Sequence, residues 1–295
     1  MPAEGPLPPL HMTEGPVQAA EPVKVRRSHL LPVADRLSRL PYWLLVTILL
    51  AVVAFWVVAN DAGSRVILQA VVQGVWTTVY VSLIAYALAL VVGLFLSLLR
   101  VHRSRIAQEA SSFYVEIVRG VPMLVLLYYI SFVGAPALVK IVNWAASPLI
   151  QSGAMAAIAP RDINFTIRAI LALCLGYGAF ISEIFRAGIQ SIGREQKEAA
   201  ATEGATYWQT MRFILLPQAV RNVLPALGNE FIAMLKDSAL VSALGVQDIT
   251  QLGKVYSAST FKFFETYSIV ALLYLVMTLG LAMLVRFLEK RMELT

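Results

Sequence analysis

Long apolar runs, almost free of charged side chains, alternate along this chain with short polar and basic segments. A helix needs about 20 mostly apolar residues to cross a bilayer core of roughly 30 Å. Five runs reach this length, and each predicts a membrane-spanning helix: Leu40–Ala59, Val66–Leu99, Gly120–Val139, Phe165–Ile189 and Thr266–Val285. Because Val66–Leu99 is longer than one span needs, we predict a break at Gly74 and a span from about Val75 to Leu99.

Two further stretches, Ile141–Pro160 and Leu224–Gly245, have the length of a span but are interrupted by polar residues. If only Leu224–Gly245 crosses, six spans place both termini in the cytoplasm, with seventeen of the 24 Lys and Arg residues on inner segments. A crossing by Ile141–Pro160 would instead turn the basic segment 186–221 outwards, against the rule that positive charge stays inside. We therefore predict about six spans with both termini cytoplasmic.

The composition independently indicates an integral membrane protein. Hydrophobic residues make up 58% of the 295 residues, charged residues only 14%, and the mean hydropathy is +0.71. A soluble globular chain carries about 25% charged residues. The single cysteine, Cys174, excludes a disulfide-stapled secreted domain, and we expect it to be a buried apolar residue. The excess of basic residues is an orientation signal here, so no nucleic acid is expected as a partner.

The first 39 residues differ from the rest of the chain, since they hold seven of its 14 prolines and show no apolar period. This composition is typical of a disordered segment, and we predict a disordered Pro-rich cytoplasmic tail over residues 1–39. A signal peptide is the competing interpretation. The lead of about forty residues and the long apolar run that follows both favour a retained helix.

Motifs for enzymatic chemistry are missing from the sequence. The three histidines are scattered, and neither a metalloprotease, a paired-cysteine nor a nucleophile-elbow pattern occurs. Gly253-Lys254 is followed by Val255, where a phosphate-binding loop needs Ser or Thr for magnesium. We expect no catalytic residue, no metal site, no cofactor bound by this chain and no ATP hydrolysis by this chain alone.

The predicted cytoplasmic segment before Pro217 has the pattern of two short helices joined by a glycine. Glu195–Glu203 is rich in helix-forming residues, and Gly204 follows where a helix C-terminus favours glycine. Thr206, with Gln209 three residues later, predicts a capping box for the second helix. Exposed aromatic residues in such an elbow, Tyr207 and Trp208 among them, favour a protein-docking surface over a plain connector.

This segment resembles the cytoplasmic loop of the membrane subunits of binding-protein-dependent ABC importers. Glu198-Ala199-Ala200, Gly204 and then Ile214-x-Leu216-Pro217 reproduce the pattern E-A-A-x(3)-G-x(9)-I-x-L-P of that family. The resemblance implies an all-α type I importer transmembrane domain, in which the coupling loop, residues 194–217, docks in a groove of an ATPase subunit. The docking residues it implies are Glu198, Ala199, Ala200 and Gly204. With the two aromatic residues of the elbow, Tyr207 and Trp208, they make up the predicted ATPase-docking set.

Three more segments resemble the polar amino acid branch of this family: Val118–Pro122, Gly176–Gly188 and Leu235–Ser242. The resemblance covers about residues 70–290, so the tail and an additional helix at residues 40–60 lie outside it. It implies two ATPase copies that carry ATP and magnesium, a second permease subunit, identical or homologous, and an extracytoplasmic amino acid-binding protein. It also implies a bacterial inner-membrane location, in contact with membrane lipid.

Ionisable residues inside spans are costly and are candidates for function. The sequence predicts a substrate path through the interrupted fifth span, at Glu230, Lys236, Asp237 and Ser238. Two structural alternatives stay open: Glu230 and Lys236 face each other, or the Lys236-Asp237 pair lies near the outer interface. An ion-coupled secondary transporter is the alternative function, because embedded carboxylates would also serve it. Glu183 and Arg186, three residues apart, predict a structural ion pair.

Overall fold

The computed structural model describes residues 42–102, 104–192, 194–206 and 209–293. Within these ranges every regular element is a helix and no strand occurs, which confirms the predicted all-helical fold. The chain forms two units, Met1–Ile48 and Leu49–Thr295. The described part of the first unit is the beginning of helix α2, Tyr42–Asn60. The predicted tail over residues 1–39 lies outside the described residues.

The second unit begins with the end of α2 and with α3, Ala62–Val101, an unbroken helix of 40 residues. The predicted break at Gly74 is therefore wrong. A Cβ built on Gly74 would lie 2.4 Å from the backbone nitrogen of Ile249 and 2.5 Å from the carbonyl carbon of Asp248. The absence of a side chain at Gly74 thus allows a distant segment of backbone to pack directly on α3. Gly74 itself has an ordinary helical conformation.

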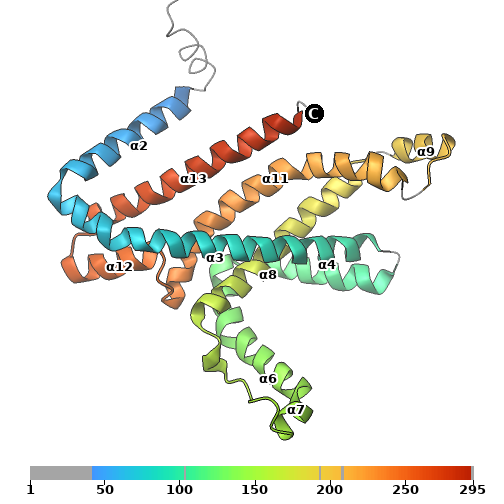
Figure 1. The fold of residues 1–295 in the computed structure, drawn as a ribbon, viewed down its shortest axis with the longest axis horizontal. Helices are drawn as coiled ribbons and strands as arrows, with labels where there is room; N and C mark the ends of the chain where they lie inside the picture. The colour runs from blue at the N-terminus through green and yellow to red at the C-terminus, as the bar shows by residue number, and fades with distance from the viewer. Residues whose placement is uncertain (1–41, 103, 193, 207–208, 294–295) are drawn as a thin grey trace, which may run out of the picture. The chain divides into compact units, whose positions relative to one another are not determined.

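After α3 the chain reverses through α4, Arg105–Gly120, and then turns aside from the long axis of α3 (Figure 1). The side branch is a continuous helical run made of α5, Met123–Tyr129, the π-helical turn η1, Ile130–Gly134, and α6, Ala135–Ala145. This run begins and ends later than the predicted span Gly120–Val139. The stretch up to Pro160 that follows is divided into short pieces, α7, Ser147–Gln151, and η2, Pro160–Asp162.

Helix α8, Phe165–Gln190, matches its prediction to within one residue and forms the centre of the second unit. It packs along α3, and the shared core contains fully buried side chains from both helices, among them Val81, Ala85, Ala89, Leu173 and Ile181. Small residues on α3 let α8 approach closely, as is common between membrane helices. The core thus fixes α8 between α3 and the elements that carry the candidate site.

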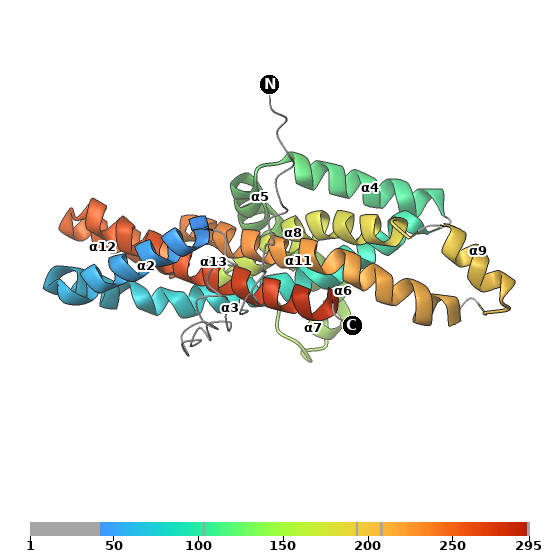
Figure 2. The same cartoon turned by 90° about the horizontal axis from the view of Figure 1, so that it is seen from above.

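The remaining helices complete the unit: α9, Arg194–Thr202, η3, Thr210–Leu215, α11, Leu216–Asp237, η4, Ser238–Leu244, α12, Ile249–Thr260, and α13, Phe263–Glu293. Figures 1 and 2 show α9 at one end of the second unit and α12 at the other, with α3 and α11 running between these ends. Helix α12 is an element that the sequence did not predict.

Four of the described helical segments are long and apolar enough to cross a membrane: Ala62–Val101, Met123–Ala145, Phe165–Gln190 and Phe263–Arg291. The predicted fifth span is built as α11 followed by η4, and the helix ends where the ionisable residues Lys236 and Asp237 occur. Helix α2 covers the described part of the first predicted span and ends one residue later, at Asn60. The total of six spans stays a prediction.

Candidate functional site

The predicted coupling loop, residues 194–217, contains the glycine-terminated helix that its sequence predicts. Helix α9 ends at Thr202, and Gly204 has a φ of +81°, the left-handed conformation that favours glycine. The N–H of Ala205 donates to the carbonyl of Ala200 at 3.0 Å, a six-residue closure that ends many helices. Gly204 therefore fixes the direction in which the chain leaves α9.

The predicted capping box is also present. The N–H of Thr206 donates to Gln209 Oε1 at 2.8 Å, and the N–H of Gln209 donates to Thr206 Oγ1 at 3.4 Å. From Gln209 the chain continues through η3 into α11. The π-helical turn closes at Leu216, whose N–H donates to the carbonyl of Met211, and Pro217 then lies in the first turn of α11.

The residues predicted to dock an ATPase differ in their placement. Ala199 and Gly204 are exposed, whereas Ala200 is buried with 5% of its surface accessible. Glu198 lies in α9 between Arg194 and Thr202. Tyr207 and Trp208 lie outside the described residues. The exposed surface of the loop thus includes Ala199 and Gly204, while Ala200 packs inwards.

A cavity of about 280 Å³ brings together two of the predicted substrate-path residues. Glu230 and Asp237 both line it, since residues seven apart lie on one face of α11, about 10 Å apart along its axis. The rest of the lining comes from α8, from the turn between α4 and α5, and from the start of α5: Tyr177, Phe180, Val121 and Met123. The Tyr177 hydroxyl donates to Asp237 Oδ2 at 2.8 Å, a contact that the sequence did not reveal.

The other two predicted substrate-path residues have different surroundings. Lys236 is exposed and is not among the residues that line the cavity. Ser238 is fully buried, and its hydroxyl donates to the carbonyl of Leu235 at 2.7 Å, which closes the end of α11. None of the ion pairs between described residues joins Glu230 to Lys236.

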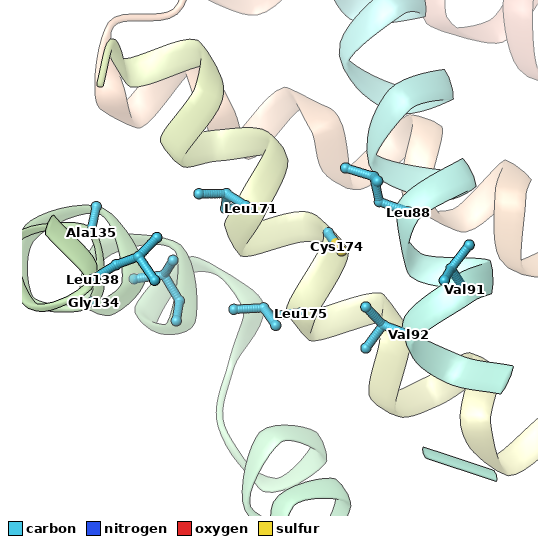
Figure 3. Close-up of a pocket in the computed structure, with 10 residues that line it drawn as sticks. Leu88, Val91, Val92, Gly134, Ala135, Leu138, Leu171, Cys174 and Leu175 are labelled. Atoms are coloured by element: carbon cyan, nitrogen blue, oxygen red, sulfur yellow. The ribbon is translucent and has the colours of Figure 1, made fainter. Parts of the chain in front are cut away.

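A second cavity, of about 410 Å³, lies between α3, α8 and the side branch that includes α6 (Figure 3). Leucine, isoleucine, valine, alanine and glycine line it, together with the buried Cys174, and none of its lining residues is ionisable. Cys174 is 5% exposed, which confirms that it is a buried apolar residue. This cavity offers no partner for a polar ligand, so it does not compete with the first as a substrate site.

An ion-pair cluster joins α3 to the end of α8. Glu183 accepts hydrogen bonds from Arg186 Nε at 3.1 and 3.2 Å, which confirms the predicted pair. Glu183 also pairs with Arg100 of α3, and Arg186 donates to Gln190. The sequence did not indicate Arg100, because 83 residues separate it from Glu183. The cluster fastens two helices at the end of the unit that carries the coupling loop.

Arg168 is a second buried charge with a structural environment. Its Nε donates to the carbonyl of Ile163 at 2.9 Å and its Nη1 to that of Ser131 at 2.9 Å, while its Nη2 donates to that of Pro160. These bonds hold the segment before α8 against η1. Across the described ranges, no group of three His, Cys, Asp or Glu residues is arranged to hold a metal ion.

Residues 86–294 match the family model described as "Binding-protein-dependent transport system inner membrane component". The chain is 34% identical over 222 residues to the Probable amino-acid permease protein YxeN of Bacillus subtilis, a match that covers 75% of this chain and 91% of that protein. It is 31% identical over 223 residues to the Glutamine transport system permease protein GlnP of Escherichia coli K12, covering 76% and 93%.

Solved structures agree with this match. The crystal structure of an amino acid ABC transporter with histidines superposes with a TM-score of 0.65 at 35% identity, covering 78% of this chain and 98% of that one. An inward-facing structure of the MetNI methionine ABC transporter superposes with a TM-score of 0.58 at 21% identity, covering 76% and 96%. The second likeness supports the fold alone.

Proposed function

Because this chain belongs to the family of binding-protein-dependent transport system inner membrane components, we propose that it carries polar amino acids as the membrane subunit of an ATP-driven importer. Amino-acid and glutamine permeases are among the proteins it resembles along most of their length. The subunit is not an enzyme, since ATP is hydrolysed on a separate ATPase subunit in this family. The matches give no support to the ion-coupled alternative.

The cavity with two carboxylates is the observation that carries the amino acid assignment. An amino acid brings an ammonium group, which loses water when it enters a membrane segment and therefore needs an anion in exchange. Glu230 and Asp237 supply that anion on one face of α11, and Tyr177 orients Asp237. We assign substrate contact to these two carboxylates. Lys236 and Ser238 lie at the end of the same helix, and we assign to them a supporting role in the substrate path.

Helix α11 gives this cavity a mechanical link to the coupling loop. It has 22 residues and is therefore about 33 Å long. It follows directly on η3, which begins four residues after Thr206, and it ends at Asp237, with Glu230 two turns before its end. When ATP binding closes the ATPase subunits, the coupling loop moves with them. Helix α11 then moves as well, and the carboxylates of Glu230 and Asp237 move with it. Access to the cavity then alternates between the two sides of the membrane.

The complete importer in this proposal has two ATPase copies that bind ATP and magnesium, a second permease subunit, identical or homologous, and an extracytoplasmic binding protein. The concentration of Lys and Arg on the predicted inner segments supports an inner-membrane subunit with both termini in the cytoplasm. Docking to the ATPase is assigned to the coupling loop through its pattern residues Glu198, Ala199, Ala200 and Gly204 and its aromatic residues Tyr207 and Trp208.

The test is uptake of labelled L-glutamine, L-histidine, L-arginine and L-glutamate by proteoliposomes that contain the co-purified permease, ATPase and binding protein. At least one of these amino acids should accumulate in a manner that needs ATP and survives an ionophore. Glu230→Gln and Asp237→Asn should each lower that uptake by about tenfold or more, because the ammonium loses a charged partner. Glu265→Gln, which neutralises an exposed carboxylate outside the cavity, should leave it unchanged.

Two results would refute the proposal. Uptake that continues without ATP and stops with the ionophore would establish ion coupling. Normal uptake by both carboxylate variants would show that the substrate does not use this cavity.

A further inference from the structure

Arg119 lies in the last turn of α4, beside the cavity that holds Glu230 and Asp237. Its guanidinium carbon is 5.6 Å from the centroid of the Phe180 ring, and Phe180 lines the cavity. Val121, two residues further along the chain, lines it too. The side chain of Arg119 is exposed and lies outside the cavity lining itself, so Phe180 is what connects it to the cavity.

Arg119 and Glu230 differ from the other charges near the core in having no close polar partner. Glu183 is held by Arg100 and Arg186, and Arg168 donates to three carbonyls. No hydrogen bond or ion pair between described residues involves the guanidinium of Arg119 or the carboxylate of Glu230. At longer range the charge of Glu230 is influenced by both Asp237 and Arg119.

A cation and an anion left unpaired beside one cavity are complementary to a zwitterion. A guanidinium carries five N–H donors in one plane and binds a carboxylate through two parallel hydrogen bonds. A guanidinium over an aromatic face is held by cation–π attraction, and its N–H edge stays free for a ligand. Phe180 therefore orients Arg119 before any substrate arrives.

We propose that Arg119 is a specificity-determining residue that binds the α-carboxylate of the transported amino acid, while Glu230 receives its α-ammonium group. The substrate side chain then extends along α11 towards Tyr177 and Asp237, about two turns away. This inference rests on the proposed function, because it assumes that the cavity receives an amino acid. It predicts that the wild type binds a compound without a free α-carboxylate more weakly than the matching free amino acid, and that this preference depends on Arg119.

The test compares each amino acid with its α-carboxamide, which keeps the ammonium group and the side chain but lacks the negative charge. Binding of L-arginine, L-argininamide, L-glutamine and L-glutaminamide is measured on the permease–ATPase complex in lipid nanodiscs. Arg119→Gln should weaken binding of the preferred free amino acid by about 10- to 100-fold, the range for a charge-assisted contact. Binding of the matching amide should change by less than about threefold.

Two further variants sharpen the comparison. Arg119→Lys keeps the charge but loses the planar fork, so its affinity for the free amino acid should fall between those of the wild type and Arg119→Gln. Arg105→Gln, at the other end of the same helix, removes an exposed arginine whose 3.8 Å pair with Glu109 contributes little, and it should bind like the wild type. Unchanged binding of the amide shows that a variant is folded.

Each outcome decides the assignment. An acid-to-amide preference that persists in Arg119→Gln, or an equal loss of both ligands, would overturn the role of Arg119 while the proposed function stands. If the proteoliposomes take up none of the four amino acids, the proposed function fails and the inference fails with it.

Discussion

Gly204 is the position at which we expect coupling to be disturbed without a change in any packing contact. Its φ is +81°, and a Cβ built there meets no atom within 4 Å. A side chain at this position therefore causes no clash, and its cost is conformational, about 1–2 kcal/mol for an L-residue in the left-handed region. That cost lowers the population of the observed loop about 5- to 30-fold. A β-branched residue is the least favourable choice.

The corresponding experiment is a graded series at this one position. Gly204→Asn should transport almost normally, since asparagine tolerates the left-handed conformation, Gly204→Ala should be impaired, and Gly204→Val should be the most impaired. Two quantities are measured in parallel, uptake and the amount of ATPase that stays bound to the permease during purification. Both should fall in the same order while the amount of permease in the membrane stays constant.

Gly153 provides a matched control, because it has a φ of +75° and a built Cβ there also meets no atom within 4 Å. It lies in the segment after α7, far along the chain from the coupling loop. Gly153→Val carries the same kind of backbone cost and should leave ATPase retention unchanged. Normal transport and a bound ATPase in Gly204→Val would show that the loop is only a connector. Equal damage from Gly153→Val would trace the effect to general destabilisation.

Four further predictions test other parts of the structure. Ala199→Trp places a large side chain on the exposed face of α9 and should abolish uptake with the permease still inserted; a variant that retains its ATPase would contradict this. Glu183→Gln weakens the link to Arg100 and should lower the melting temperature of the purified complex by about 3–8 °C, and an unchanged value would make the cluster dispensable. Gly74→Ala should greatly reduce the yield of monodisperse protein in size-exclusion chromatography, because its Cβ would meet the backbone of Ile249 at 2.4 Å; a normal yield would refute the close contact. Tags at both ends of the chain should resist protease added outside intact cells, and cleavage of either would rule out six spans with both termini inside.

Elements defined by local signals could be predicted from the sequence. Helix α8 follows an apolar run with few interruptions, and its predicted end differs from the observed one by a single residue. The glycine-terminated α9 and the capping box at Thr206 depend on residues three to six positions apart, so their geometry is encoded locally. Such features need no knowledge of what packs against them.

Gly74 and α12 show what local signals leave out. A glycine inside a long apolar run is equally compatible with a break in the helix and with a close contact to another segment. At Gly74 it is a close contact, because the backbone of Ile249 packs directly on it. Helix α12 has a start signal in the sequence, since Asp248 precedes Gln251 by three residues and accepts a hydrogen bond from its N–H at 2.8 Å. The helix is short and mixed in polarity, so the search for long apolar runs did not predict it.

Charges inside the spans give the clearest case in which sequence and structure answer different questions. The sequence indicates that each such charge is costly, but it does not separate a charge that holds the fold from one that is kept for a ligand. The structure separates them by their partners: Glu183 is bound by Arg100 and Arg186, and Arg168 by backbone carbonyls, so removing these residues should damage assembly. Glu230 and Arg119 stay beside a cavity without a hydrogen-bonding partner among the described residues, so removing them should spare the fold and change what the cavity binds.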